Sequence, residues 1–442
     1  MIYLGIFLIL VLGFLIVNFI NPKITLVEKV FSGFLISSGL ISFLWFIVYL
    51  TGVTFNLSNT LSVLSIVLVV FVILNVLFKR KIYLDISTLF KFKKYELIIG
   101  TLILLAFASS FLADIYWPIR DWDALTLYDF RGRFFASQND ISSVFDIHRY
   151  YLGYPLYTSI FHGFIYLIDD TGNPLFIYAL IYISLIAVVH SVLSRITNKT
   201  VAMVFTFVIA FTYEIFDHSL LAYTNLPYSS FLIIGYLYLL NYFTENSKAH
   251  LFMSALFIGL SGWIRSSDPF WIPPILLLIY EAVKSKKYNS FVVFVLMILF
   301  FRVPWSIYVS EISKNYAITS SNNIGMLFST SLTKYIDQLF LVIPYVWVNV
   351  IKPQLSVYIL FALSLLVYLP KQSKTVNAIK SLVLINLAVI FGGVYFYSIV
   401  YDKWQVIGNS VTRMSIFMTP LILIQLAIIL YNWQKSKHLH GK

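Results

Sequence analysis

The chain has 442 residues, of which 60% are hydrophobic, 18% aromatic and only 11% charged. Its mean hydropathy of +0.86 is far above that of soluble domains, which excludes an ordinary soluble enzyme and indicates a protein that crosses the membrane several times. The net charge is +12 and cysteine is absent, so disulfides, thiolate metal sites and cysteine nucleophiles are excluded.

Apolar runs long enough to cross a bilayer recur along the whole chain, because a hydrocarbon core of about 30 Å needs a helix of about 20 residues. The runs lack the alternation of a β-barrel, so we expect an all-α polytopic membrane protein with about 13 transmembrane helices. The expected spans are 2–20, 30–50, 61–78, 96–113, 174–194, 201–217, 227–243, 249–264, 268–283, 289–310, 353–369, 380–398 and 413–431. The first has no basic leader and no small-residue cleavage site, so we expect it to be retained.

The distribution of positive charge sets the expected orientation. The connection at 79–94 is short and strongly basic, which places it in the cytoplasm and the start of the chain outside. The other lysine-rich connections then fall inside as well, provided that 155–168 and 335–350 do not cross the membrane. Each of these segments contains a proline and suits a helix lying in the outer interface. Membrane insertion therefore accounts for the net charge, so we expect membrane lipids as partners and no nucleic acid.

The stretch 114–173 is the most polar part of the chain and forms the first expected external loop. Asp121 and Asp123 lie near its start. An ionised aspartate can accept a proton from an attacking hydroxyl, and an Asp-x-Asp pair can also hold a divalent cation. A salt bridge from either carboxylate to Arg120 or Arg131 is the alternative.

The residues after Asp123 have the pattern of an amphipathic helix lying flat on the membrane. The apolar side of the helical wheel carries Ala124, Leu127, Tyr128, Phe134 and Phe135, and the polar side carries Thr126, Asp129, Arg133 and Ser137.

Most arginines fall on the expected outer side, whereas lysine dominates the inner side. A guanidinium holds phosphate through its planar fork, so outer arginines are candidate contacts for an anionic head group; interfacial anchoring is the alternative. The candidates are Arg149, in a cluster with His148 and Tyr154, and Arg265 and Arg413 in later outer turns. Arg265 is close enough in sequence to Asp268 to form a simple pair instead.

A further polar turn surrounds Asn225, between spans that otherwise carry few polar side chains. Polar groups at that depth need partners, which suggests either a cavity shared with the first external loop or a turn whose groups satisfy one another.

These residues resemble motifs of the GT-C superfamily of integral-membrane glycosyltransferases, which includes aminoarabinose transferases and protein O-mannosyltransferases. The likeness covers about 96–310, with one further motif near the C-terminus. The matching motifs are Asp121-Trp122-Asp123-Ala124, Tyr154-Pro155, Ala222-Tyr223-Thr224-Asn225-Leu226-Pro227, Arg265 to Pro269, and Asn409-Ser410-Val411-Thr412-Arg413. Asn225 departs from the pattern, because the superfamily usually has an acid there.

The resemblance implies a GT-C-like bundle and a polyprenyl-phosphate-linked sugar as donor, with transfer at the extracytoplasmic face of the cell membrane to an acceptor that the sequence does not identify. Asp123, with Asp121 as second choice, would be the general base. Arg149, Arg265 and Arg413 would stabilise the leaving phosphate. We place His148, Tyr154 and Asn225 in the same substrate-binding set.

The expected organisation is N-terminal helices at 1–95, a catalytic core at 96–310 with its external loop at 114–173, and a C-terminal part at 311–442. We expect no metal or other cofactor to be required, with a divalent cation at Asp121 and Asp123 as the alternative. Two other functions stay open: a transporter or flippase for a lipid-linked glycan, and a polysaccharide polymerase or ligase.

Overall fold

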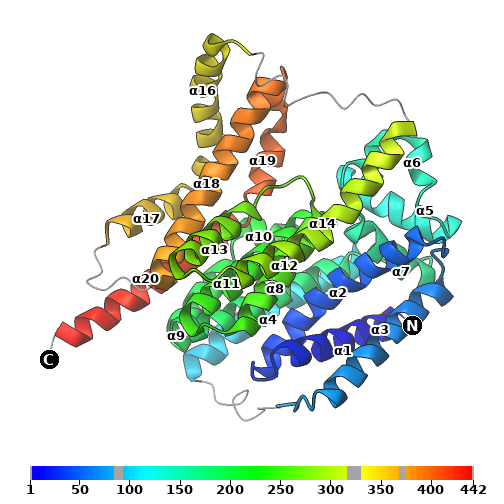
Figure 1. The fold of residues 1–442 in the computed structure, drawn as a ribbon, viewed down its shortest axis with the longest axis horizontal. Helices are drawn as coiled ribbons and strands as arrows, with labels where there is room; N and C mark the ends of the chain where they lie inside the picture. The colour runs from blue at the N-terminus through cyan, green and yellow to red at the C-terminus, as the bar shows by residue number, and fades with distance from the viewer. Residues whose placement is uncertain (1, 84–92, 316–329, 368–373, 441–442) are drawn as a thin grey trace.

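The computed structural model describes residues 2–83, 93–315, 330–367 and 374–440, and every regular element within these ranges is a helix (Figure 1). Eight helices in the described ranges are long and apolar enough to cross a membrane, or nine if the bent pair Lys199–Ala210 and Tyr213–Leu220 is one span. The chain is therefore an all-α polytopic integral membrane protein.

The helices of the first half are α1 (Ile2–Ile20), α2 (Leu26–Leu50), α3 (Leu57–Leu77), α4 (Lys94–Tyr116), the π-helix η2 (Ala124–Asp129), α5 (Phe130–Gln138), α6 (Val144–Ile147), η3 (Arg149–Leu152), α7 (Tyr157–Ile168), α8 (Phe176–Ile196), α9 (Lys199–Ala210), α10 (Tyr213–Asp217) and η4 (His218–Leu220). Those of the second half are α11 (Asn225–Glu245), α12 (Lys248–Ile264), α13 (Ile272–Ser285), α14 (Asn289–Asn315), α16 (Leu332–Val346), η5 (Trp347–Ile351), η6 (Lys352–Gln354), α17 (Leu355–Leu366), α18 (Lys374–Val400), η7 (Trp404–Ile407), α19 (Gly408–Met414) and α20 (Met418–His440).

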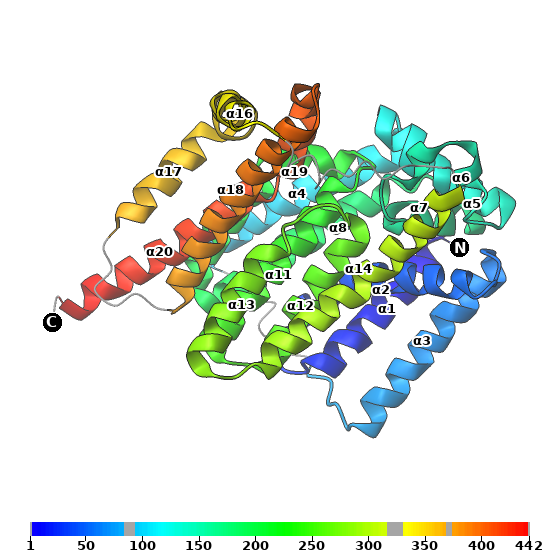
Figure 2. The ribbon, with the colours of Figure 1, turned by 45° about the horizontal axis from the view of Figure 1, so that its top comes forward.

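Helix α11 lies at the centre of the bundle, packed against α8, α12 and α18. Its residues from Asn225 to Asn241 are buried without interruption, and α12 is buried over most of its length. A helix that is apolar on all sides and enclosed by other helices forms the core of a bundle, whereas its neighbours also face the lipid. Figure 2 shows α3 and the C-terminal end of α20 at the outside of this arrangement.

The contact between α1 and α2 depends on two glycines. A β-carbon added at Gly13 would meet the backbone of Gly33, and one added at Gly33 would meet the backbone of Gly13. Small residues let membrane helices approach closely enough for their backbones to touch. This pair therefore fixes α1 tightly against α2.

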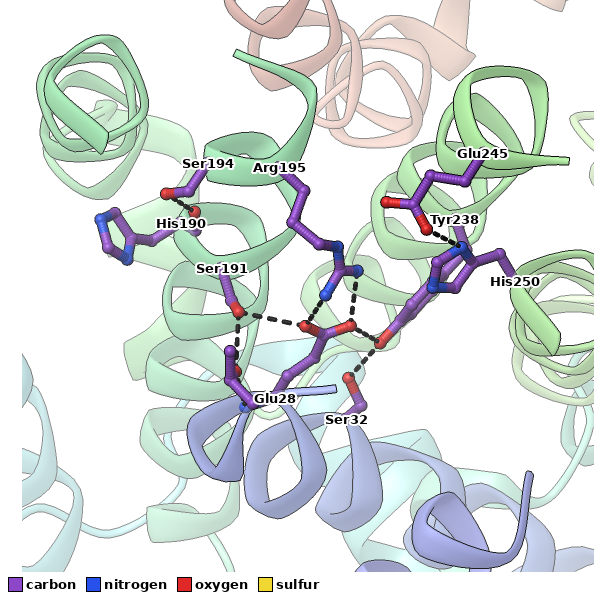
Figure 3. Close-up of polar contacts among 10 residues, drawn as sticks. Glu28, Ser32, His190, Ser191, Ser194, Arg195, Tyr238, Glu245 and His250 are labelled. Atoms are coloured by element: carbon purple, nitrogen blue, oxygen red, sulfur yellow. Dashed lines mark hydrogen bonds and ion pairs between the residues drawn. The ribbon is translucent and has the colours of Figure 1, made fainter. Parts of the chain in front are cut away.

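A buried ion pair joins three helices at the end of the bundle where α2 begins and α8 ends (Figure 3). Both oxygens of the Glu28 carboxylate accept from Arg195, whose Nη2 lies 2.8 Å from Oε1. The Tyr238 hydroxyl donates to the same carboxylate at 2.8 Å, and Ser191 donates at 3.1 Å. Because Glu28 is fully buried, these donors compensate the cost of removing its charge from water.

Other ion pairs gather at that same end, which we call the basic end. Lys199 at the start of α9 pairs with Glu96 at the start of α4 at 2.9 Å, and Lys374 at the start of α18 pairs with Glu281 near the end of α13 at 2.7 Å. The opposite end, where α4 and α12 finish and α11 starts, is called the site end.

The expected number of about 13 spans exceeds the eight or nine that the helices support by length and composition. Each expected span overlaps at least one helix, and the last two residues of 353–369 lie outside the described residues. The excess comes partly from α12 and α13, which have only 17 and 14 residues. The expected spans 227–243 and 413–431 correspond mainly to α11 and α20, which are not among the eight helices that qualify as candidate spans.

The two segments expected not to cross the membrane differ from each other. Helix α7 has 12 residues, a length of about 18 Å, which is too short to cross a bilayer. The segment 335–350 belongs to a longer apolar run, Leu332–Leu366, that counts among the eight candidate spans. Figure 2 shows α16 nearly end-on while α17 runs across the view, so the run changes direction at η5 and η6.

Candidate functional site

Residues from four separate parts of the chain surround one small polar cavity at the site end, here called the central cavity. Its volume is about 20 Å³. The lining residues are Asp123, Tyr128, Tyr154, Tyr223, Asn225, Arg265, Ser410 and Arg413. Five of the eight candidate residues therefore meet here: Asp123, Tyr154, Asn225, Arg265 and Arg413.

Asp123 lies at the start of η2 and pairs with Arg413 of α19 across the cavity, with Nη1 3.1 Å from Oδ2. The Tyr150 hydroxyl faces the other oxygen at 3.5 Å. The side chain of Asp123 is 37% exposed, so solvent and substrates can reach it. Arg413 also lies over the Tyr223 ring, 5.2 Å from its centre, and its backbone carbonyl accepts from Asn225 at 3.1 Å.

Arg265 follows the last residue of α12 and is nearly fully buried. Its Nε donates to Asp268 at 2.6 Å and its Nη1 donates to the Thr224 hydroxyl at 3.3 Å. The guanidinium lies 4.9 Å from the centre of the Tyr154 ring. Burial acts to lower the pKa of Arg265, but the Asp268 carboxylate outweighs it and the pKa is raised, so this side chain carries a permanent positive charge.

A second, larger cavity opens beside the first and is called the apolar cavity. Its volume is about 480 Å³, and much of its lining comes from α18 together with Phe270 and Met414. It shares Tyr154, Arg265 and Ser410 with the central cavity. An apolar space thus leads directly to a buried guanidinium.

The other candidate residues lie elsewhere. Asp121 lines a separate cavity, so the two carboxylates of the Asp-x-Asp motif point to different spaces. His148 is exposed, and its Nδ1 accepts from the backbone N–H of Tyr150 at 3.1 Å, which is a local capping bond. Arg149 begins η3, but its side chain lies outside the described part of the structure.

Arg131 does not pair with the aspartates of the loop. It is fully buried, and its Nη1 donates to the backbone carbonyls of Tyr151 at 2.8 Å and Tyr154 at 2.9 Å. Burial lowers the pKa of Arg131 to about 10, which still leaves it charged at neutral pH. This side chain holds the segment that carries Tyr154 against the cavity.

Asp129, expected on the solvent side of an amphipathic helix, is buried instead. The other residues of the pattern lie as expected, with Ala124, Leu127, Tyr128 and Phe135 buried and Arg133 and Ser137 exposed. The wider turns of the π-helix η2 move Asp129 round the axis to the buried side. The carboxylate accepts from Tyr166, from Arg133 at 2.9 Å, and faces Nδ1 of His162 at 3.2 Å. His162 in turn faces the Tyr178 hydroxyl at 3.2 Å. A π-turn has no simple sequence signal, which explains why the pattern missed this cluster.

The described ranges hold few side chains that could bind a metal ion together. No three side chains of His, Asp or Glu gather there as ligands for a metal ion. Asp121 and Asp123 line different cavities.

The fold and these cavities define a class: an all-helical membrane protein with a charged pocket at one end of the bundle, connected to an apolar cavity. No sequence-family model matches the chain, and no curated protein matches it. Among solved structures, the chain is similar to ArnT from Cupriavidus metallidurans bound to undecaprenyl phosphate, with 14% identity and a TM-score of 0.49. The match covers 78% of this chain and 63% of ArnT, so the chain spans less than two thirds of that protein.

Proposed function

We propose that the protein is a membrane glycosyltransferase that moves a sugar from a polyprenyl-phosphate donor to an acceptor hydroxyl or amine. The observation that carries this proposal is the junction of the two cavities. An ionised carboxylate, Asp123, and two guanidiniums, Arg265 and Arg413, surround one small space that adjoins an apolar cavity of about 480 Å³.

The arrangement suits a donor with an apolar tail and an anionic head group. The isoprenoid chain would lie in the apolar cavity along α18, and its phosphate would reach Arg265 where the two cavities meet. Arg265 is already fixed by Asp268 and Thr224 through Nε and Nη1, so its remaining amino group, Nη2, is held in one orientation. A preorganised donor of this kind stabilises charge that develops during a reaction.

The chemistry is a single displacement. The acceptor oxygen or nitrogen forms a bond to the anomeric carbon of the sugar while the bond from that carbon to the phosphate oxygen breaks. Asp123 takes the proton of the acceptor. The electron pair of the broken bond stays on the polyprenyl phosphate, where Arg265 and Arg413 balance the added negative charge.

Arg413 would have one partner before the donor binds and a different one during the reaction. In the structure it pairs with Asp123, and with a phosphate bound it would have two anionic partners in one cavity. Transfer of the guanidinium from the carboxylate to the phosphate would leave Asp123 free to accept a proton. Donor binding would in this way prepare the base.

The orientation follows from the ends of the bundle. The basic residues at 79–81, 93–94 and 284–287 belong to the basic end, which the positive-inside rule places in the cytoplasm. The central cavity is at the opposite end, so the reaction would take place on the extracytoplasmic side of the cell membrane.

Replacement of the general base provides the test. In a purified system with a panel of polyprenyl-phosphate sugars, Asp123→Asn should lower the transfer rate by about 10²–10⁴-fold, because the amide cannot accept the proton. The variant should still bind undecaprenyl phosphate, since the arginines and the apolar cavity remain. Asp170→Asn, an exposed carboxylate outside the central cavity, is the matched control and should keep full activity. Turnover of Asp123→Asn close to that of the wild type would exclude the assignment.

A further inference from the structure

A third cavity, called the acidic cavity, lies next to the central cavity and has no role in the scheme above. Its volume is about 150 Å³, and its lining includes Asp114, Arg120, Asp121 and Ala222. Two short segments separate the acidic cavity from the central cavity. Asp121 and Ala222 line the acidic cavity, and their near neighbours Asp123 and Tyr223 line the central cavity. The acidic cavity shares no lining residue with the apolar cavity.

Asp114 is the unusual group in this cavity. The residue is fully buried at the end of α4, and neither oxygen of its carboxyl group has a hydrogen bond of standard geometry; its one polar neighbour is the backbone N–H of Ala179 in the first turn of α8. Its backbone is held firmly, because Asn173 donates to the carbonyl of Asp114 at 2.7 Å and to that of Trp117 at 2.8 Å. A buried carboxyl group with a single backbone contact destabilises the fold, because most of its hydrogen-bonding capacity is unused.

The charges around Asp114 favour a cation. Asp121 lines the same cavity, and Asp217 is near enough to Asp121 and Arg120 to interact with the charge of both. The cavity is therefore lined by two carboxyl groups and one guanidinium, and a third carboxyl group lies near enough to add to the negative charge. A group that brings a positive charge and several N–H donors would satisfy Asp114 and balance this excess.

We propose that the acidic cavity binds an ammonium group of the acceptor, with Asp114 and Asp121 as its partners. This inference rests on the proposed function, in which the donor fills the two cavities that share Arg265 and so leaves the acidic cavity to the second substrate. The α-carbons of Asp121 and Asp123 are at most about 7 Å apart. The ammonium group and the attacking hydroxyl would thus belong to one small head group, as in an amino alcohol or an amino sugar, and only the hydroxyl would react.

Binding of a minimal amino alcohol tests the proposal without any transfer reaction. Ethanolamine should raise the midpoint of thermal unfolding of the purified full chain by about 2 °C or more at saturation, because it binds the folded state only. Ethylene glycol, which has the same shape without the charge, should cause no shift at equal concentration and ionic strength. Asp114→Asn should abolish the ethanolamine shift, whereas the control Asp170→Asn should retain it.

Several results would overturn the proposal. An equal ethanolamine shift in wild type and Asp114→Asn would remove Asp114 from the site. A shift with MgCl₂ in place of ethanolamine, also lost in Asp114→Asn, would make the cavity a metal site. Competition between ethanolamine and undecaprenyl phosphate would place the ammonium group with the donor; additive shifts are expected instead. Asp114→Asn should fold, because the substitution removes a buried acid, and its own midpoint verifies this.

The outcome is distinguishable from failure of the proposed function. If no polyprenyl-phosphate sugar supports transfer by the wild type, the glycosyltransferase assignment fails while an Asp114-dependent ethanolamine shift would still define a cation site. If transfer is observed and the shift is absent, only the acceptor subsite is wrong.

Discussion

Asp129 connects the first external loop to α7 through a single carboxylate. Tyr166, Arg133 and His162 all converge on it, and Arg133 also lies over the Tyr166 ring at 4.3 Å. Burial by itself would raise the pKa of Asp129, but the hydrogen bonds and charge of His162, with those of Tyr166 and Arg133, outweigh burial and hold the pKa below its usual range. The ionised form is therefore the one that stabilises the loop.

The direction of this pKa shift predicts how stability depends on pH. A carboxyl group whose pKa is lower in the folded than in the unfolded state stabilises the fold above its unfolded pKa, near 4, and loses that contribution as the pH falls through the folded value. Asp129→Asn should thus cost about 1.5–3 kcal/mol at pH 6, the contribution of hydrogen bonds to a charged group. The difference from wild type should shrink as the pH approaches 3.

Thermal unfolding of both proteins in the same detergent at pH 6, 4 and 3 measures this difference. Exposed Asp170→Asn should track the wild type at each pH. An Asp129→Asn penalty that stays constant from pH 6 to pH 3 would show that the carboxylate charge is unimportant.

At the scale of the elements, the contact of α1 with α2 tolerates almost no added side-chain volume. Gly33→Ala would place a methyl group against the backbone of Gly13, which cannot move as a flexible side chain does. Overpacking of this kind typically costs about 1–3 kcal/mol. We expect a matching loss of stability in thermal unfolding.

Gly100→Ala provides the comparison, because a β-carbon at Gly100 in α4 meets nothing within 4 Å. This substitution should be neutral or stabilise the helix by up to about 1 kcal/mol, since alanine has the higher helix propensity. Equal effects of the two substitutions would mean that helix propensity, and not close packing, controls stability at both sites.

The helices themselves were predictable from sequence, because hydrophobic length is a direct requirement of the bilayer. Their packing was less so. Helix α12 reads as an ordinary span, yet it has 17 residues and is enclosed by other helices. The wheel drawn for 124–137 placed Asp129 in solvent, because it assumed the turn of an α-helix where the structure has a π-helix.

For the whole molecule, the absence of cysteine gives a direct test of orientation. Ser137→Cys introduces a single exposed thiol in the first external loop at the site end. Ser285→Cys introduces one at the basic end, at the last residue of α13. In intact cells or spheroplasts, a membrane-impermeant maleimide should label Ser137→Cys and leave Ser285→Cys unlabelled.

Permeabilised cells serve as the control, and both variants should label there. The reversed pattern in intact cells would place the central cavity in the cytoplasm and contradict the proposed side of reaction.

The candidate site was predicted in part at this scale. Asp123, Arg265 and Arg413 are far apart in sequence, and only the order of their motifs suggested that they meet. Glu28 was missed, because a single acid at the start of an apolar span gives no pattern, and Asp114 counted only as the first residue of the polar loop. The structure shows that both acids are buried and that they differ in their hydrogen-bond partners. Neither burial nor hydrogen-bond partners can be read from the sequence.

The small size of the central cavity has an energetic consequence. About 20 Å³ accommodates roughly one water molecule, which is too little for a phosphate group. Although solvent reaches Asp123, entry of the donor phosphate under the proposed function would require Arg413 to move apart from Asp123. The free energy needed for this opening would weaken the observed affinity for any phosphate ligand. A short soluble sugar phosphate should therefore bind poorly, and the long hydrocarbon chain of the donor would supply most of the binding free energy.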